Sequence, residues 1–295
     1  MGTYVTIVVY SLDKGKAEAS IDAAFNRIDE IEKIASVYDE KSEVSRLNRE
    51  GYIDNPSPEL VELINLSIKY YELTNGCFDI TVQPVLKLWE EGLWKEDPDV
   101  QAEKIEEALK LVGSDKIRLD KNRIELETGG MAITLGGIAA GYAVDEALKT
   151  MQGMGITSAL INLGGDIKVI GLKPGEEKWF IALENPDNRT QKIAEFELSD
   201  KAITTSGNYE RYFNPEKTAH HIIDPRSGFS ANECISATVI ADSCVEADAL
   251  ATGVFVMGPK EGLGLVESLD GVEALIIDQD RNIYKSSRLY KYLSE

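Results

Sequence analysis

The sequence predicts an α+β fold in which helices pack on a largely antiparallel sheet. Strand-like and helix-like segments are mixed without the regular β-α-β alternation of a parallel sheet. Some β-rich segments are separated only by a short turn, as in ALINLGGDIKVIG at 159–171, which is typical of hairpins. No repeat or long Pro/Ser linker divides the 295 residues, so we expect one domain spanning 1–295.

The first quarter of the chain predicts one strand and two long helices. Residues 3–10 are rich in β-branched side chains and predict a strand. Apolar residues recur at helical spacing from Ile21 to Ala35, which predicts an amphipathic helix over about 14–36. Ser57-Pro58 is a helix-start signal and Asn75-Gly76 a helix-end signal, so a second helix is expected between them.

The remaining chain predicts short strands, hairpins and further helices. Residues 90–107 are polar and acidic and suggest a surface loop and helix. The glycine-rich stretch LGGIAAGYAVD at 135–145 opens a helix, and another helix is expected over 242–257. Strands are expected in hairpins at 116–127, 159–171 and 274–287, and singly at 179–186, 193–199, 201–207, 220–224 and 234–242.

The composition excludes several classes of protein. A formal net charge of −20 repels phosphate backbones, so we expect no nucleic-acid partner. Three cysteines outside any CxxC spacing form no disulfide framework, and two histidines are too few for a His-rich zinc site. No apolar run reaches about 18 residues, and no signal peptide is visible, so any leader would lie outside this sequence.

Asp248 and Thr252 are the first candidate site residues. They are four positions apart in a predicted helix, so their side chains share one face. A carboxylate and a hydroxyl placed in this way can bind a hard cation such as Mg²⁺. Alternatively, Asp248 is simply a carboxylate in the first turns of a helix, where the helix dipole favours negative charge.

Three further segments each allow a functional and a structural interpretation. Backbone N–H groups of the glycine cluster at 135–145 could hold a phosphate, or its glycines could serve tight helix packing. His221 could accept a proton near neutral pH, or be a structural histidine beside the turn DPRSG. Asp79 interrupts the apolar run CFDITV, so its carboxylate needs donors from neighbouring N–H groups or from a polar heterocycle.

Taken in order, the motifs resemble those of one family, the FAD:protein FMN transferases or ApbE-type flavin transferases. The resemblance covers nearly the whole chain and rests on MGTYVTIVV, YDEKSEVSRLN, GCFDITVQPVLKLW, LGGIAAGYAVD, ALINLGGDI, TTSGNYERYF, HHIIDPRSG and EADALATGVFVMG. It implies two lobes around a flavin-nucleotide cleft. It also implies a Mg²⁺-dependent enzyme that splits FAD, attaches FMN through a phosphoester to a Thr or Ser of an acceptor protein, and releases AMP.

The resemblance also implies partners and site residues. The acceptor would be a subunit of a membrane redox pump, and the enzyme would work at the outer face of the cytoplasmic membrane. His221 matches the histidine that accepts the hydroxyl proton, and Gly137, through its carbonyl, joins Asp248 and Thr252 at metal-ligand positions. The positions that match FAD contacts are Tyr38, Cys77, Phe78, Asp79, Thr134, Ala140 and Ile222.

This sequence departs from the family pattern at two of those positions. Relatives usually carry Asp at the position of Thr134 and often Lys or Glu at that of Ala140, while Ala251 replaces a residue that can be acidic. Two alternatives to the transferase remain, and the changes at Thr134 and Ala140 favour the second of them. One is an FAD pyrophosphatase that uses water to give FMN and AMP, and the other is a flavin-binding protein without enzymatic activity.

Overall fold

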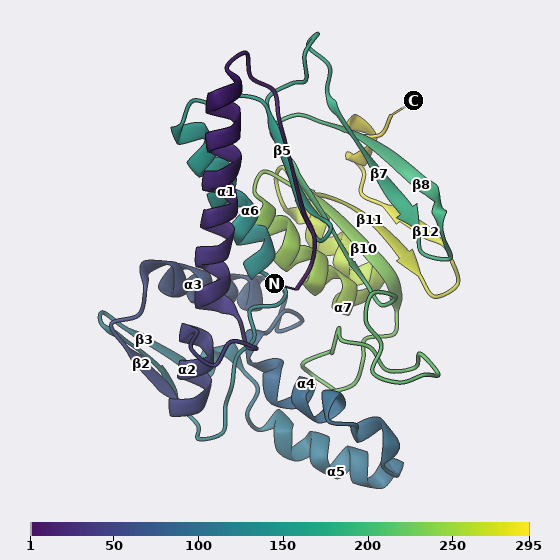
Figure 1. Cartoon of the computed structure of the whole chain (residues 1–295). Helices are drawn as coiled ribbons and strands as arrows, with labels where there is room; N and C mark the ends of the chain where they lie inside the picture. Colours follow the sequence, from purple (N-terminus) through teal and green to yellow (C-terminus); the bar gives the residue numbers. More distant parts are fainter. Residues whose placement is uncertain (1, 295) are drawn as a thin grey trace.

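A seven-stranded sheet forms the centre of the molecule, and the predicted α+β class is confirmed (Figure 1). The computed structural model describes residues 2–294, apart from the side chain of Arg189. All neighbouring strands of this sheet are antiparallel. In spatial order they are β1 (Val5–Val9), β5 (Ala159–Leu163), β6 (Asp166–Ile170), β9 (Ala202–Gly207), β10 (Cys234–Ala241), β11 (Glu273–Asp278) and β12 (Ile283–Lys285).

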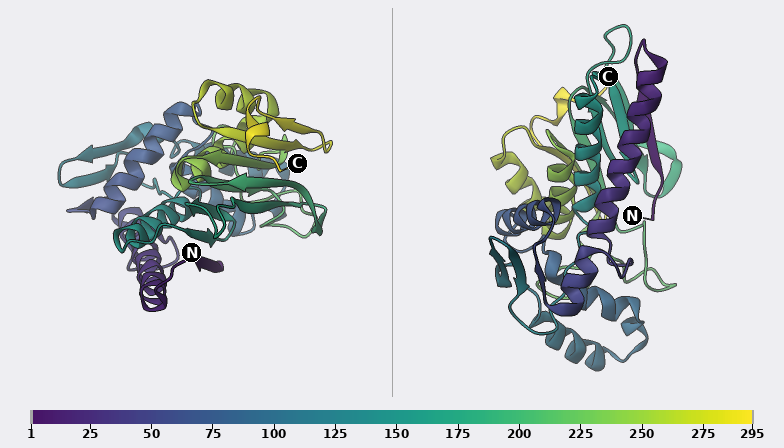
Figure 2. Two further views of the ribbon diagram at one scale, coloured as in Figure 1. Left: turned by 90° about the horizontal axis from the view of Figure 1, so that it is seen from above. Right: turned by 60° about the vertical axis from the view of Figure 1, so that its left-hand side comes forward.

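Helices cover one face of this sheet and a hairpin covers the other. The helical layer consists of α1 (Lys14–Ala35), α3 (Pro58–Leu73), α6 (Ala139–Gly153) and α7 (Cys244–Ser268), and Figure 2 shows α1 alongside α6. The main core lies beneath these helices and includes Ile31, Leu63, Ala143, Val239 and Phe255. No helix within residues 2–294 is both long and apolar enough to cross a membrane.

The hairpin of β7 (Trp179–Asn185) and β8 (Asn188–Leu198) packs on the opposite face. Its apolar side chains and those of the sheet form a second cluster, the hairpin-side core, which includes Trp179, Phe196, Ile203, Ile240 and Leu289. Successive residues of β9 and β10 therefore alternate between the two cores, as the two-residue period of a strand requires. This alternation decides which polar side chains of the sheet face α7.

A smaller lobe lies at one end of the sheet (Figure 1). It contains α2 (Glu43–Glu50), a three-stranded sheet of β2 (Tyr52–Asp54), β4 (Arg123–Leu126) and β3 (Ile117–Asp120), and the helices α4 (Gln83–Glu90) and α5 (Pro98–Leu109). Helices α4 and α5 share a third apolar cluster with Ala219 and Ile223 of the segment at 208–233, which we call the histidine loop. This cluster is what joins the histidine loop to the small lobe.

The structure corrects several element predictions. Residues 220–224 form no strand, only single bridges at His220 and Ile223. The helix expected over 242–257 continues to Ser268, past a break at Gly258-Pro259. Helices α2 and α4 were not predicted. The helix start at Ser57 is correct, because its hydroxyl accepts from the N–H of Leu60.

Candidate functional site

The crossing of α6 and α7 places Asp248 against the backbone of α6. The N–H of Gly141 donates to Asp248 Oδ2 at 3.0 Å. A Cβ atom at position 141 would lie 2.4 Å from the carbonyl oxygen of Cys244, which no side chain tolerates. Gly141 is therefore required for close helix packing, so the structural interpretation of the glycine cluster holds at this position.

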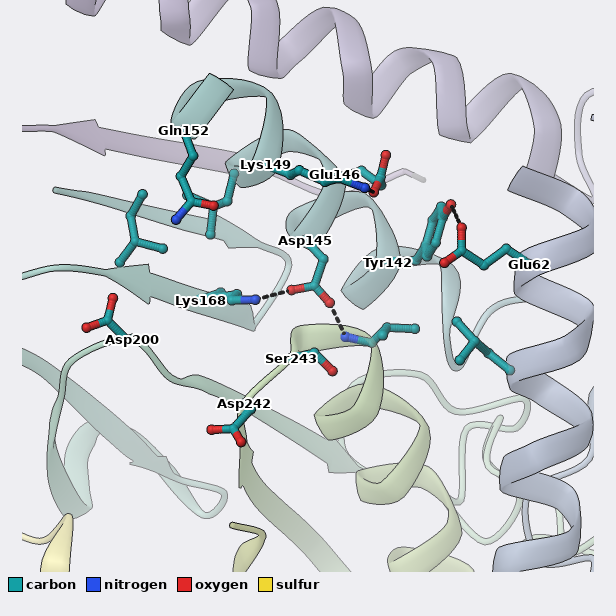
Figure 3. Close-up of a pocket in the computed structure, with 14 residues that line it drawn as sticks. Glu62, Tyr142, Asp145, Glu146, Lys149, Gln152, Lys168, Asp200, Asp242 and Ser243 are labelled. Carbon is teal, nitrogen blue, oxygen red and sulfur yellow. Dashed lines mark hydrogen bonds and ion pairs between the residues drawn. The ribbon is translucent and has the colours of Figure 1, made fainter. Parts of the chain in front are cut away.

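A second carboxylate of α6, Asp145, holds the start of α7. Asp145 accepts hydrogen bonds from the backbone N–H groups of Cys244 (3.0 Å) and Val245 (2.9 Å), and pairs with Lys168 of β6 at 2.6 Å (Figure 3). Asp145 thus holds the positive end of α7 from another helix, while Glu246 lies in the first turn of α7 and Asp248 in the next. Sequence reasoning missed Asp145, although it follows Gly141 by one helical turn and so shares its face.

Figure 3 shows a pocket around Asp145, and its volume is about 460 Å³. The pocket is lined by positively and by negatively charged side chains from α3, α6, β6 and the turn before α7. Examples are Glu62, Glu146, Lys149, Lys168 and Asp242. Most of these groups already pair with one another, as Tyr142 does with Glu62 at 2.7 Å. The pocket contains none of the residues predicted to contact FAD.

Asp248 is a buried carboxylate with a single hydrogen-bond donor in the structure. It is 7% exposed, and burial raises its pKa, an effect that the Gly141 N–H only partly offsets. The pKa of Asp166, at the start of β6, is also raised, first by burial and then by the charge of Asp248. Asp248 is buried and Asp166 is half-buried, and a cation bound between two neighbouring carboxylates would relieve the repulsion between them.

Thr252 and Gly137 meet beside the ring of Phe78. Thr252 Oγ1 lies 3.2 Å from Ser206 Oγ. A Cβ atom at position 137 would lie 3.0 Å from Thr252 Oγ1 and 3.3 Å from Phe78 Cε2. Gly137 therefore lies close to the Thr252 hydroxyl and the Phe78 ring, where a larger side chain would be crowded.

These residues fit a hard cation. Within residues 2–294, no group of three or more His, Cys, Asp or Glu side chains is placed to hold a metal ion. A cation here would depend on the Asp248 carboxylate, the Thr252 hydroxyl and a backbone carbonyl such as that of Gly137. This oxygen-only set suits Mg²⁺, which is usually bound by one or two carboxylates, substrate phosphates and several waters.

Asp79 is held by the protein itself. Its Oδ1 accepts from the backbone N–H of Thr81 (2.8 Å) and from the hydroxyls of Thr81 (2.6 Å) and Ser114 (2.7 Å), and Oδ2 accepts from the Ser114 N–H at 3.2 Å. Burial raises its pKa despite these donors. Asp79 caps the short 3₁₀ helix Ile80–Val82, so it does stand at the start of a new element.

The other predicted FAD positions differ in how open they are. Phe78 is buried next to Gly137, and the N–H of Thr134 donates to the Ile80 carbonyl at 2.7 Å, which brings two of the predicted segments together. Ala140 is half-buried in the first turn of α6. Cys77 and Ile222 belong to the main core, whereas Tyr38 is 74% exposed.

The two histidines have different environments. His220 is buried: Nε2 lies 3.0 Å from the carbonyl of Ala231, Nδ1 accepts from the N–H of Ile222 at 3.3 Å, and the ring packs edge-on against Phe255 of α7. Burial first, and then the neighbouring His221, lowers its pKa to about 4. It is therefore a neutral structural histidine, and its contact with Phe255 joins the histidine loop to α7.

His221 is half-buried and uses only one ring nitrogen in the structure. Nδ1 lies 3.2 Å from the carbonyl oxygen of Arg211, and burial lowers the pKa of the ring. A carbonyl only accepts hydrogen bonds, so Nδ1 carries the proton and the lone pair is on Nε2. Among residues 2–294, no group makes a hydrogen bond with Nε2. A neutral imidazole held in this way is equipped to accept a proton.

Arg211 connects His221 with Tyr38. Its carbonyl contacts the His221 ring, while its guanidinium donates to the Tyr38 hydroxyl at 3.2 Å and pairs with Glu90 of α4. Sequence reasoning did not single out Arg211, and its position in NYERYF offered only a motif match. The structure thus shows two groupings, Phe78–Gly137–Thr252 beside Asp248, and Tyr38–Arg211–His221.

Comparison with known proteins identifies the relatives. The model of the ApbE family matches residues 1–276. The chain is 31% identical to an FAD:protein FMN transferase of Vibrio cholerae over 277 residues, which cover 91% of this chain and 83% of the relative. It is 32% identical to the FAD:protein FMN transferase of Haemophilus influenzae, with 100% and 90% covered. These names confirm the prediction of an enzyme of the flavin-transferase type.

Solved structures agree over the whole length. An ApbE protein of Thermotoga maritima superposes with a TM-score of 0.90 at 32% identity, covering 100% of this chain and 97% of that one. The flavin transferase ApbE of Vibrio cholerae gives a TM-score of 0.83 at 29% identity, covering 99% and 96%. Sequence and fold lead to the same conclusion: this chain belongs to the ApbE family.

Proposed function

We propose that this protein transfers FMN from FAD to a Thr or Ser hydroxyl of an acceptor protein, in a Mg²⁺-dependent reaction that releases AMP. The observation that supports the proposal is the hydrogen bonding of the two ring nitrogens of His221. Its Nδ1–H is held by the Arg211 carbonyl, and its Nε2 is left without a protein partner in the structure. A flavin-binding protein without enzymatic activity has no need of such a base.

The proposed reaction assigns a role to each of these residues. Nε2 of His221 accepts the proton of the acceptor hydroxyl as its oxygen attacks the phosphorus on the FMN side of the FAD pyrophosphate. One P–O bond forms to the acceptor, the P–O bond to AMP breaks, and AMP leaves. Mg²⁺ held by Asp248, Thr252 and the Gly137 carbonyl would neutralise charge on the pyrophosphate. The Phe78 ring and the exposed Tyr38 would contact the flavin nucleotide.

The acceptor and the place of action extend this proposal. We infer a subunit of a membrane redox pump as the acceptor, with the reaction at the outer face of the cytoplasmic membrane, from family resemblance. The pyrophosphatase alternative uses the same residues with water as the nucleophile. The transferase and pyrophosphatase reactions differ only in whether FMN becomes attached to a protein or is released.

The test is a transfer assay. The protein is mixed with FAD, Mg²⁺ and a candidate acceptor, and the products are separated on a denaturing gel. We expect flavin fluorescence in the acceptor band, and its loss when EDTA is added or when the acceptor hydroxyl is replaced by Ala. Free FMN and AMP without acceptor fluorescence, across candidate pump subunits, would favour the pyrophosphatase.

A further inference from the structure

The sheet beneath α7 carries a row of polar side chains at the place where Asp248 and Thr252 face it. The register pairs Ile167 with Ile203 and Lys168 with Ala202, so Asp166 of β6 lies beside Thr204 of β9. Ile203 belongs to the hairpin-side core and Ala202 to the main core. Because strand residues alternate faces, Asp166, Thr204 and Ser206 all point to the helical layer.

One hydrogen-bond contact and one electrostatic interaction place this row against α7. Ser206 Oγ lies 3.2 Å from Thr252 Oγ1. Asp166 lies close enough to Asp248 for the two carboxyl groups to interact electrostatically. The sheet therefore faces the two predicted metal-ligand side chains of α7 with a carboxylate and hydroxyls rather than with apolar residues.

Thr204 adds an independent observation. It is 1% exposed, and its hydroxyl has no hydrogen-bond partner among the described residues. A buried hydroxyl without a partner loses free energy and usually indicates a water or an ion that satisfies it. On the opposite face of the same strand, the hydroxyl of Thr205 is satisfied by Thr238 at 2.9 Å. Among the described residues the Ser236 hydroxyl, on the hairpin side of β10, also lacks a partner, but Thr204 lies in the row that faces α7.

We propose that β6 and β9 supply the second half of the cation site: Asp166 is a further carboxylate ligand, and Thr204 and Ser206 bind water molecules of the cation's coordination shell. Two facing carboxylates relieve their mutual repulsion by binding a divalent cation between them, and Mg²⁺ commonly retains several waters that need hydrogen-bond partners. This inference rests on the proposed function for the identity of the cation.

The test measures cation binding without turnover. Mn²⁺ is titrated into the full chain by calorimetry, with and without FAD. We expect Asp166→Asn and Thr204→Val each to weaken binding by about tenfold or more, as losses around metal sites typically do. Thr205→Val is the matched control, because it changes the neighbouring residue on the other face. Its Mn²⁺ affinity should equal that of the wild type.

Thermal unfolding distinguishes a role of Asp166 as a cation-binding residue from a purely structural role. Without cation, Asp166→Asn should melt at about the same temperature as the wild type, because Asn has nearly the same size and shape as Asp. Mn²⁺ should then raise its melting temperature much less than that of the wild type. Wild-type affinity in Asp166→Asn, equal losses in Thr204→Val and Thr205→Val, or no Mn²⁺ binding by the wild type would each overturn the proposal. Asp166-dependent Mn²⁺ binding in a protein that transfers no flavin would refute only the transferase.

Discussion

The two halves of the candidate site are built in opposite ways. At the α6–α7 crossing, Asp248 is held inside the main core, where Gly141 touches the Cys244 carbonyl and Asp145 holds the first turn of α7. The histidine loop contains no regular strand or helix and is held by single bridges and a few side chains such as Trp89. Core packing thus fixes the position of Asp248, whereas a few contacts of the histidine loop orient His221.

The largest effect is expected at Asp248. Asp248→Ala should reduce flavin transfer by about a thousandfold or more, because bound metal ions contribute several kcal/mol of transition-state stabilisation. Asp248→Asn is the sharper variant, since it retains an oxygen that can accept the Gly141 N–H. Both are assayed across a Mg²⁺ titration, with circular dichroism to check folding. Near-normal turnover of either variant at low Mg²⁺ would contradict the metal assignment.

Replacement of His221 should lower the transfer rate while FAD still binds. We expect His221→Ala to lose about 10²–10⁴-fold, the usual contribution of a general base. The base must be neutral, so the wild-type rate should fall as pH drops, with a midpoint below the ordinary pKa of about 6.5 because burial lowers the pKa of His221.

His220→Ala provides the comparison for that variant. It removes the contact with the Ala231 carbonyl and the packing on Phe255, so it should lower stability more than chemistry. Transfer rates and urea unfolding of the two variants are measured side by side. Equal rate losses in both would remove the basis for choosing His221.

Ala140 tests whether a charged side chain at this position strengthens FAD binding. Ala140→Lys should tighten FAD binding by roughly ten- to a hundredfold, the worth of one charge-assisted hydrogen bond to a phosphate. The side chain is only half-buried, so there is a route for the longer residue. Calorimetric titration of FAD and melting temperatures are recorded for both forms. Unchanged or weaker binding together with a lower melting temperature would instead identify Ala140 as a packing residue.

Gly141→Ala should directly disturb the packing of α6 against α7. The added Cβ would lie 2.4 Å from the Cys244 carbonyl oxygen, and overpacking of this kind typically costs about 1–3 kcal/mol of unfolding free energy. Gly153→Ala, near the other end of α6, is the matched control because its Cβ would meet nothing within 4 Å. Urea unfolding of the two variants measures the difference. Equal stability would show that the helix crossing is less tight than the structure indicates.

The smallest effect is expected from Trp89→Phe in α4. The change removes the hydrogen bond from Trp89 Nε1 to the Gly228 carbonyl, at 2.8 Å, which is worth about 1 kcal/mol. Backbone amides of the histidine loop should then exchange hydrogen faster, with little change in global stability. Trp94→Phe, in the same apolar cluster, is the control. Equal exchange in both variants would mean that Trp89 does not hold the loop.

The sequence was most informative where local rules dominate. The Ser57 helix start, the 116–127 hairpin and the helical face shared by Asp248 and Thr252 all follow from spacing and capping, and the structure has each of them. The prediction of a strand at 220–224 was wrong. β propensity alone does not provide a neighbouring strand with which the segment could pair. The roles of the site residues remain predictions.

The sequence by itself determined the α+β class, the family and the residue types of the site, because these depend on local pattern and motif order. Only the tertiary structure decided that Asp145 rather than Asp248 meets the positive end of α7, that Arg211 lies between Tyr38 and His221, and that Asp166 lies in the row of β6 and β9 that faces α7. Each of these pairs residues far apart in the chain. The physical reason is that strand register and helix packing set such contacts, and neither is encoded by the spacing within a single segment.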